Sequence, residues 1–329
     1  MKKGIVIGKF YPPHKGHGFL IEYARKRVDE LTIIVCHRDD QKIHGNLRAE
    51  WLRETYPDAT VLVVLDIGKD DDSKAWADYT RDFLGYVPDA VFTSEDYGEN
   101  YAKFLGCRHF LVDKKRKAVP ISATEIRNDP LRHLDLLEPC VRAYFVKRIC
   151  LVGAESTGKT TLAKALAEHY STVWVPEFGR MSTEAKMPGT KFPTWNSDEF
   201  AFIAQEQNKM EDHFAKQANK ILFCDTDSFA TRIWHERYMG FMSEKVTRES
   251  ADRKCDLYLL AGDEIPFEQD GTRDGEKIRH AMQSRFEEEL RKNNKPFVLL
   301  SGTKEERLEK AVKECEKILS GRSLTAKLE

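Results

Sequence analysis

The sequence predicts an α/β protein with two doubly wound domains, each built on a parallel sheet. Short runs of β-branched residues alternate with longer amphipathic stretches along the whole chain, which is typical of βαβ units. The alternation starts again near residue 147, and a chain of 329 residues is longer than one hydrophobic core usually supports. We therefore predict a first domain over residues 1–146 and a second over residues 147–329.

The first domain is expected to alternate strands and helices from its first residues. Its candidate strands are residues 4–8, 31–36, 61–67, 90–93 and 109–112. Its candidate helices are residues 19–28, 48–55, 76–84 and 97–105. Residues 129–147 also have a helical pattern, which Pro139 interrupts, and we expect this segment to lead into the second domain.

The second domain repeats the alternation with longer helices. Its candidate strands are residues 148–152, 173–175, 221–224, 257–260 and 297–300. Its candidate helices are residues 159–170, 198–217 and 279–292. Short apolar strands separated by helices favour a parallel sheet that is covered on both faces.

Charge balance and cysteine pattern limit the classes of partner. The chain has 53 Lys and Arg against 54 Asp and Glu, so no overall positive field attracts nucleic acid or anionic lipid, and phosphate recognition must be local. The seven cysteines form no C-x-x-C pair and no zinc-type cluster, which indicates reduced core residues. The first apolar run is too short for a signal peptide or a membrane span. We expect a cytoplasmic protein without nucleic-acid or membrane partners.

The loop after the first strand, residues 8–17 with the sequence GKFYPPHKGH, is the first candidate site. Ligands of open parallel sheets bind outside the carboxyl ends of the strands, where this loop lies. His14 and His17, on the turn that enters a helix, can both point at one ligand, and Gly16 lets the backbone come close. Imidazole and backbone N–H donors suit a phosphate group. The alternative interpretation is a pair of surface histidines on a proline-rich turn.

A second element supports the phosphate interpretation. Residues 121–127, with the sequence ISATEIR, follow the fifth strand and open a helix. Ser122 and Thr124 can cap this helix, and Arg127 can reach phosphate oxygens.

These two elements resemble the H-x-G-H nucleotidyltransferase superfamily, whose members carry a G-x-F-x-P-x-H-x-G-H loop and a later I-S-x-T-x-[IV]-R loop. The resemblance implies a Rossmann-like domain that transfers a nucleotidyl group from ATP to a phosphate acceptor and releases pyrophosphate. It implies that His14 and His17 bind the ATP phosphates and stabilise the transition state, and that Ser122 and Arg127 hold the β- and γ-phosphates. The further candidates for ATP binding in this domain are Gly8, Lys9, Phe10 and Thr124.

Residues 153–160, with the sequence GAESTGKT, match the P-loop pattern G-x-x-x-x-G-K-[ST] at every fixed position. They follow a predicted strand and open a predicted helix, which is the context that a P-loop requires. In this arrangement Lys159 pairs with β- and γ-phosphate oxygens, and Thr160 coordinates Mg²⁺. The candidate nucleotide-binding residues of the loop are Gly153, Glu155, Ser156, Thr157, Gly158, Lys159, Thr160 and Thr161.

Three acidic residues near the P-loop are candidates for kinase chemistry. Asp225 ends an apolar strand and could act on Mg²⁺ through water, as in a Walker B element. Asp227 is expected to face substrate or metal, with a helix N-cap before residues 228–238 as the alternative. Glu177 is the candidate base for the acceptor hydroxyl, with a structural ion pair to Arg180 as the alternative.

Residues 266–274 read as a mobile turn before a helix, and their arginine is a further catalytic candidate. Arg273 could close over the transferring phosphoryl group and neutralise its developing charge. The alternative is a solvated loop arginine.

A nucleotidyltransferase domain followed by this P-loop kinase domain resembles the NadR-type bifunctional family. The likeness covers residues 4–319 and includes the motifs TSEDYG, PEFGR and DTD. It implies that the second domain, with Mg²⁺ and ATP, converts nicotinamide riboside to nicotinamide mononucleotide, which the first domain adenylylates to NAD. Stacking on the nicotinamide ring needs aromatic faces, for which Trp76 and Trp195 are candidates. Arg48 and Arg180 are further candidates for substrate binding.

One departure from the family pattern affects function. Longer members begin with a helix-turn-helix domain, whereas here the first strand starts within a few residues of Met1, so we expect no repressor activity. Two rivals stay open: transfer to other acceptors, such as phosphopantetheine or another nucleoside, and a regulatory protein in which one site only senses a nucleotide. A homo-oligomer is compatible with the sequence.

Overall fold

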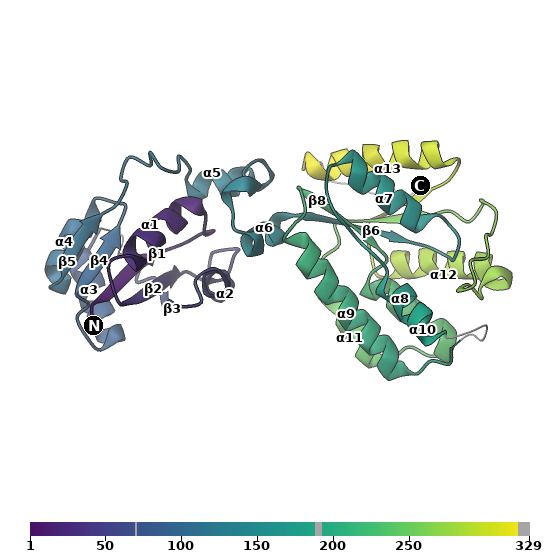
Figure 1. Ribbon diagram of the computed structural model, residues 1–329, viewed down its shortest axis with the longest axis horizontal. Helices are drawn as coiled ribbons and strands as arrows, with labels where there is room; N and C mark the ends of the chain where they lie inside the picture. Colours follow the sequence, from purple (N-terminus) through teal and green to yellow (C-terminus); the bar gives the residue numbers. More distant parts are fainter. Residues whose placement is uncertain (70, 188–192, 322–329) are drawn as a thin grey trace. The chain divides into compact units, whose positions relative to one another are not determined.

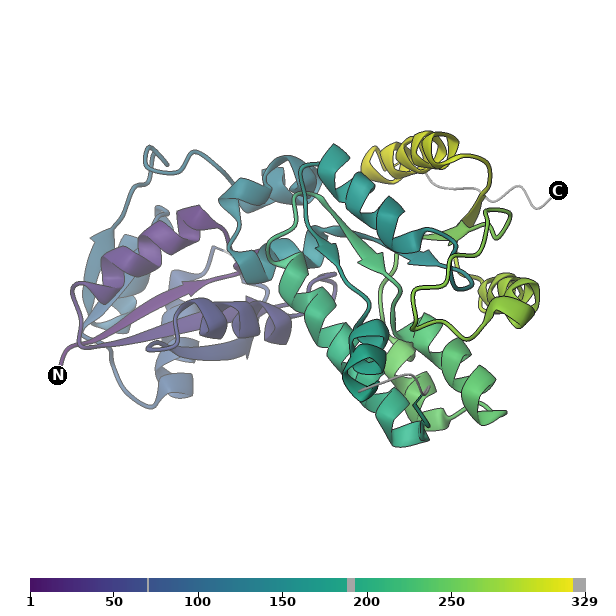
Figure 2. The ribbon, with the colours of Figure 1, turned by 45° about the vertical axis from the view of Figure 1, so that its right-hand side comes forward.

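The computed structural model describes residues 1–69, 71–187 and 193–321. The chain divides into a first unit, Met1–Arg142, and a second unit, Ala143–Glu329 (Figures 1 and 2). The division lies four residues before the predicted boundary after Val146. Each unit has its own parallel sheet with helices on both faces, so the predicted α/β class with two doubly wound sheets is confirmed.

The first sheet has the strand order β3-β2-β1-β4-β5, with all neighbours parallel. Its strands are β1 (Lys3–Gly8), β2 (Glu30–His37), β3 (Thr60–Leu65), β4 (Ala90–Thr93) and β5 (Arg108–Leu111). Its helices are α1 (Lys15–Arg25), α2 (Gly45–Thr55), α3 (Ser73–Leu84), α4 (Tyr97–Leu105) and α5 (Ala123–Asn128). The 3₁₀ turns η1 (Pro130–Arg132) and η2 (Leu134–Leu136) then lead to α6 (Pro139–Phe145). All five predicted strands are present.

Alternation along the central strand β1 produces two cores. Val6 packs on one face with residues of α1 and α2, whereas Ile5 packs on the other face with residues of α3 and α4. Successive strand residues point to opposite faces, so an uninterrupted apolar strand buries both sides of the sheet. The chain crosses from one face to the other around β1, and the carboxyl end of β1 therefore lies at the switch point of the sheet.

The second sheet has the order β10-β9-β6-β8-β7, again with parallel neighbours. Its strands are β6 (Lys147–Val152), β7 (Trp174–Val175), β8 (Ile221–Asp225), β9 (Leu257–Ala261) and β10 (Phe297–Leu300). Its helices are α7 (Lys159–His169), α8 (Phe178–Lys186), α9 (Ser197–Ala215), α10 (Ser228–Met239), α11 (Glu244–Ala251), α12 (Arg279–Lys292) and α13 (Lys304–Leu319), with a 3₁₀ turn η3 (Glu276–Ile278). Helices α7 and α13 share one face, and α8, α9, α10 and α12 lie on the other (Figure 1).

Two differences from the predicted elements have local causes. Helix α1 begins at Lys15 and not at residue 19, because the His14 side chain accepts from Gly16 N and caps the helix. Pro139 begins α6 and does not interrupt a helix, since proline is tolerated in the first helical turn. Helices α8, α11 and α13 were not among the predicted elements.

No helix among the described residues is long and apolar enough to cross a membrane.

Candidate active sites

A cavity of about 760 Å³ opens in the first unit. Its lining includes the predicted nucleotide-binding residues of two separate loops, which the fold brings together at the carboxyl end of β1. These residues are Gly8, Lys9, Phe10, His14, His17, Ser122, Thr124 and Arg127.

The two histidines of the first cavity lie against each other, with ring centroids 3.8 Å apart. Nδ1 of His14 accepts a hydrogen bond from Gly16 N at 3.1 Å, and Nδ1 of His17 accepts from His14 N at 3.3 Å. A neutral imidazole that accepts at Nδ1 carries its proton on Nε2. Each ring therefore has one N–H left to donate to a ligand in the cavity.

Burial keeps both rings uncharged. Burial lowers the pKa of His14 to about 4, with help from the positive charge of Arg116. Burial also lowers the pKa of His17 well below its usual value, and the neighbouring His14 adds to this effect. At neutral pH the pair therefore acts through directed N–H donors and not through full positive charges.

Helix α5 supplies the second group of donors. Ser122 caps the helix, and its hydroxyl and backbone N–H both bond to Glu125. Arg127 donates to the hydroxyl of Thr124 at 2.9 Å and to the carbonyl of Tyr11, so its guanidinium is held between α5 and the loop after β1. The helix N-terminus and Arg127 together favour an anion in the cavity.

Arg48 lies in another place than predicted. It is fully buried on α2 and is not among the described residues that line the cavity. Its guanidinium donates to the carbonyl of Lys9 and, at 3.2 Å, to the carbonyl of Cys36. The structure therefore corrects the prediction of substrate contact: Arg48 supports the loop after β1 from behind.

Trp76 lines the first cavity, as expected for a residue that stacks on a ligand, and its indole N–H donates to the carbonyl of Lys69 at 3.0 Å. Three further lining residues, Asp66, Tyr97 and Arg116, were not predicted. The basic run at residues 114–117, KKRK, was an available signal for Arg116. Tyr97 belongs to the TSEDYG motif, which was an available signal for it. Asp66 carried no motif, because only the sheet brings it beside β1.

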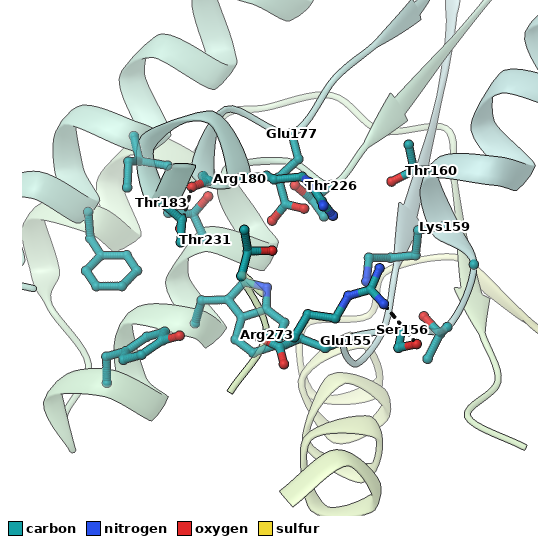
Figure 3. Close-up of a pocket in the computed structure, with 18 of the residues that line it drawn as sticks. Glu155, Ser156, Lys159, Thr160, Glu177, Arg180, Thr183, Thr226, Thr231 and Arg273 are labelled. Atoms are coloured by element: carbon teal, nitrogen blue, oxygen red, sulfur yellow. Dashed lines mark hydrogen bonds between the residues drawn. The ribbon is translucent and has the colours of Figure 1, made fainter. Parts of the chain in front are cut away.

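The second unit contains a cavity of about 170 Å³ at the carboxyl end of β6 (Figure 3). Of the predicted P-loop residues, Gly153 lies outside its lining, whereas Glu155, Ser156, Thr157, Gly158, Lys159, Thr160 and Thr161 line it. Gly153 has φ +133°, and a Cβ there would lie 2.8 Å from the carbonyl oxygen of Ala261. The Lys159 ammonium donates to the carbonyls of Gly153 and Ala154, at 3.0 and 2.8 Å. A phosphate in the loop would take over these bonds.

Thr160, Asp225 and Glu177 offer oxygen atoms near the P-loop. Thr160 donates its hydroxyl to Oδ2 of Asp225, and Oδ1 of Asp225 is buried without a hydrogen-bond partner among the described residues. Hydroxyl and carboxylate oxygens are the ligands that Mg²⁺ takes beside nucleotide phosphates. No group of three or more His, Cys, Asp or Glu side chains in the described ranges could hold a metal ion. The Thr160 hydroxyl and Oδ1 of Asp225 fit a Mg²⁺ ion, which would also need oxygen ligands from a nucleotide phosphate and water.

Glu177 lies at the end of β7 and faces the second cavity (Figure 3). Burial, together with the negative charge of Asp225, raises the pKa of Glu177 to about 7. No ion pair joins Glu177 to Arg180 among the described residues, since Arg180 pairs with Glu184 and Asp270 instead. A carboxyl group that titrates near neutral pH is suited to take a proton from a hydroxyl.

Asp227 does not face the second cavity, and this corrects the prediction of a substrate or metal contact. Its Oδ1 accepts from Ala230 N at 2.9 Å, which caps α10, and its Oδ2 accepts from the hydroxyl of Tyr258 at 2.7 Å. The side chain is buried and is not among the described lining residues. The N-cap, which was the alternative interpretation, describes its position.

Arg273 and Arg180 both line the second cavity. Arg273 belongs to the segment before η3, and its guanidinium donates to the hydroxyl of Ser156 at 3.2 Å (Figure 3). Arg273, which was predicted to close over the transferring phosphoryl group, thus contacts the P-loop itself.

An aromatic cluster borders the second cavity on the side of α9 and α10. Trp195 lines the cavity, and its ring centroid lies 5.6 Å from that of Phe200 and 6.4 Å from that of Tyr238. Trp234 and Tyr238 also line the cavity and were not predicted. Their spacing of four residues places them on one helix face, and this spacing was the signal that could have found them.

Comparisons with known proteins agree with this arrangement. A family model described as an AAA domain matches residues 148–307. The chain is 30% identical over 319 residues to the trifunctional NAD biosynthesis/regulator protein NadR of Escherichia coli (strain K12), covering 90% of this chain and 78% of that protein. The NadR protein of Salmonella typhimurium (strain LT2) is 30% identical over 320 residues with the same coverage. A nicotinamide-nucleotide adenylyltransferase of Caldivirga maquilingensis is 26% identical over 93 residues, which are 26% of this chain and 52% of that protein.

Two solved structures share the fold of nearly the whole chain. A crystal structure of NadR protein in complex with NAD and AMP-PNP has a TM-score of 0.74 and 21% identity, and the match covers 98% of this chain and 97% of that one. A crystal structure of NadR protein in complex with NR has a TM-score of 0.77 and 21% identity, covering 100% and 99%. The extent of identity to the two curated NadR proteins shows that the chain belongs to the NadR family of NAD-biosynthesis transferases.

Proposed function

We propose that this chain catalyses two consecutive ATP-dependent transfers. The second unit phosphorylates nicotinamide riboside to nicotinamide mononucleotide, and the first unit adenylylates that product to NAD with release of pyrophosphate. The observation that carries the proposal is the pair of phosphate-binding loops, one after β1 and one after β6, each at the switch point of its own sheet. The substrates follow from the names of the family relatives.

The kinase half of the proposal assigns a role to each group in the second cavity. The riboside hydroxyl attacks the γ-phosphorus of ATP, its proton passes to Glu177, and ADP leaves. Lys159 and Arg273 neutralise charge on the transferring phosphoryl group. The aromatic cluster with Trp195 supplies a surface for the nicotinamide ring. Arg180, at the start of α8, contacts the acceptor in this proposal, which its position in the cavity lining supports.

Mg²⁺ is the cofactor in this proposal, and Thr160 and Asp225 would hold it. When bound, it supplies neutralisation of the β- and γ-phosphate charges. Thr160 would contribute its hydroxyl, and Asp225 the carboxylate oxygen that has no partner among the described residues.

The adenylyltransferase half uses the first cavity. A phosphate oxygen of nicotinamide mononucleotide attacks the α-phosphorus of ATP, and pyrophosphate leaves. His14 and His17 donate N–H groups to the charge that develops on the phosphate oxygens, while Ser122, Thr124 and Arg127 hold the leaving group. Such donors are rigid before the reaction, so no reorganisation is needed as charge develops. Trp76 stacks on the second substrate in this proposal, which its position in the cavity lining supports.

Product analysis with separated substrates tests the proposal. The wild-type chain with Mg²⁺ and ATP is expected to convert nicotinamide riboside to the mononucleotide and then to NAD. Lys159→Ala is expected to lower the rate of riboside phosphorylation by about 10²-fold or more, while added mononucleotide is still converted to NAD. His17→Ala is expected to have the opposite pattern. Lys164→Ala, on the exposed side of the same helix α7, is the matched control for Lys159 and should leave both rates unchanged.

Three outcomes would contradict parts of the proposal. If neither product forms, the chain acts on other acceptors. If the P-loop binds ATP without phosphoryl transfer, and Lys159→Ala changes only the kinetics of adenylylation, the second unit is a nucleotide sensor. If one Lys159 substitution abolishes both reactions, the two sites are not separate.

A further inference from the structure

One carboxylate, that of Asp270, joins two arginines that come from different elements of the second unit. Oδ2 of Asp270 lies 2.6 Å from Nη2 of Arg180, on α8, and 3.1 Å from Nη2 of Arg273. Oδ1 accepts from the backbone N–H and the hydroxyl of Thr272, at 3.1 and 2.8 Å. One oxygen thus shapes the local turn, and the other bridges two guanidinium groups.

The segment that carries Asp270 also lies on the P-loop. We call residues 262–275, between β9 and η3, the lid loop. Glu268 N in this loop donates to the hydroxyl of Ser156, and Gly275 N donates to Oε2 of Glu155, each at 2.8 Å. The lid loop therefore contacts the side chains at two variable positions of the P-loop, and Asp270 connects the same loop to α8. The lid loop therefore joins the nucleotide side of the cavity to the side on which Glu177 lies.

Asp270 is placed to act through the arginines and not on a ligand directly. Arg180 and Arg273 line the cavity, whereas Asp270 is not among the described residues that do. Figure 3 shows Arg273 reaching across the cavity toward Lys159 and Ser156. The two positively charged guanidinium groups repel each other, and the negative charge of the bridging carboxylate compensates this repulsion. Although partial burial acts to raise it, the bonds from Arg180 and Thr272 lower the pKa of Asp270 to about 2, so the negative charge persists at neutral pH.

We propose that Asp270 is a positioning residue of the kinase site, a clasp that holds Arg180 and Arg273 together over the region of phosphoryl transfer. The inference rests on the proposed kinase function of the second unit. With the clasp intact, both guanidinium groups are ordered before the reaction, and the lid loop keeps water from the γ-phosphate. Without it, the arginines separate, and the lid loop is held only from the P-loop side.

Asp270→Asn tests the clasp, because the amide still accepts from Thr272 but no longer carries the charge that binds two arginines. We expect kcat for riboside phosphorylation to fall about ten- to hundredfold, with a change in KM for ATP of less than about threefold. The ratio of ATP hydrolysed to riboside phosphorylated should rise, since water reaches the open site. Amide hydrogen exchange over residues 266–275 should quicken in the protein without substrates.

Two further variants separate positioning from general damage. Glu184→Gln removes the other carboxylate partner of Arg180, 3.0 Å away on α8, and should leave kcat, coupling and lid-loop exchange near the wild-type values. Asp270→Glu keeps the charge and should recover part of the loss. Calorimetric binding of two ATP equivalents per chain, as in wild type, shows that each variant retains a folded P-loop, and adenylylation of nicotinamide mononucleotide should be the same in all of them.

The outcomes distinguish failure of the clasp from failure of the proposed function. If wild type phosphorylates the riboside and Asp270→Asn matches it in kcat, coupling and exchange, the clasp is refuted. Equal losses in Asp270→Asn and Glu184→Gln also refute it, because the effect would then come from Arg180 alone. If wild type does not phosphorylate the riboside but the exchange and ATP hydrolysis of Asp270→Asn still differ, the clasp stands and the acceptor is a different one.

Discussion

Individual side chains in both cavities have their properties set by burial. The two histidines of the first cavity stay neutral because they are buried, and Glu177 stays partly protonated near pH 7 for the same reason. Behind the first site, the buried Arg48 donates to two backbone carbonyls, so it supports a loop and does not contact the cavity. Position relative to the cavity, more than residue type, decides which of these roles applies.

The raised pKa of Glu177 leads to a pH dependence of the kinase reaction. Below about pH 7 the carboxyl group of the free enzyme is protonated and cannot accept the hydroxyl proton, so kcat/KM for nicotinamide riboside should rise with pH and level off above about pH 8. Glu177→Gln should lower kcat by about 10²- to 10⁴-fold and remove this rising limb. Initial rates of riboside phosphorylation, measured from about pH 5.5 to about pH 9, give this pH profile for both proteins.

The adenylyl transfer of the same Glu177→Gln preparation serves as the control and should keep its own rate. A Glu177→Gln variant that retains the wild-type rate and pH profile would show that another group accepts the proton.

At the scale of elements, each site depends on a strand that ends, a loop that turns sharply and a helix that begins. In the P-loop, Gly158 precedes α7 with φ +80° and Gly153 follows β6 with φ +133°. Both values lie where L side chains are strained. The two positions differ in the space around them. A Cβ on Gly158 would lie 3.6 Å from Ile265 Cδ1, whereas a Cβ on Gly153 would lie 2.8 Å from the carbonyl oxygen of Ala261.

We therefore expect Gly153→Ala to be more damaging than Gly158→Ala. Gly158→Ala should cost about 1–2 kcal/mol of backbone strain, and Gly153→Ala about 3 kcal/mol because a steric clash is added. Thermal unfolding of the second unit and calorimetric ATP binding measure both effects. Gly240→Ala is a matched control: it has φ +78° with open space around it and lies at the end of α10, so it should lower stability without changing ATP affinity. Equal losses at positions 153 and 158 would contradict the steric part of the argument.

At the scale of the whole molecule, each unit has its own sheet and its own buried clusters, so neither needs the other to complete a core. Helix α6 spans the division after Arg142. Its buried residue Cys140 contacts Thr55 and the carbonyl of Trp51, both in α2 of the first unit. The second unit takes over at β6, where Lys147 N donates to the carbonyl of Lys220.

These contacts favour a cut after Val146, and we expect the fragments 1–146 and 147–329 to retain one activity each. Fragment 1–146 should adenylylate nicotinamide mononucleotide, and fragment 147–329 should phosphorylate the riboside, since each contains its complete phosphate-binding loops. Fragment 1–142 is the matched control: it cuts α6, and its unfolding midpoint should lie about 5 °C below that of fragment 1–146. If fragment 1–146 is unfolded while the full chain is active, the first unit depends on the second.

The sequence by itself determined the fold class, all ten strands and the position of the two candidate phosphate-binding loops. Those features are local, because a strand, a glycine-containing loop and a helix N-terminus follow one another within about a dozen residues. Only the tertiary structure shows the long-range contacts of Arg48, Asp227 and Asp270. Their partners lie 39, 31 and 90 residues away along the chain, and no spacing in the sequence records such a contact. These long-range side-chain hydrogen bonds depend on which strand ends lie next to each other. The packing of the sheets sets that arrangement.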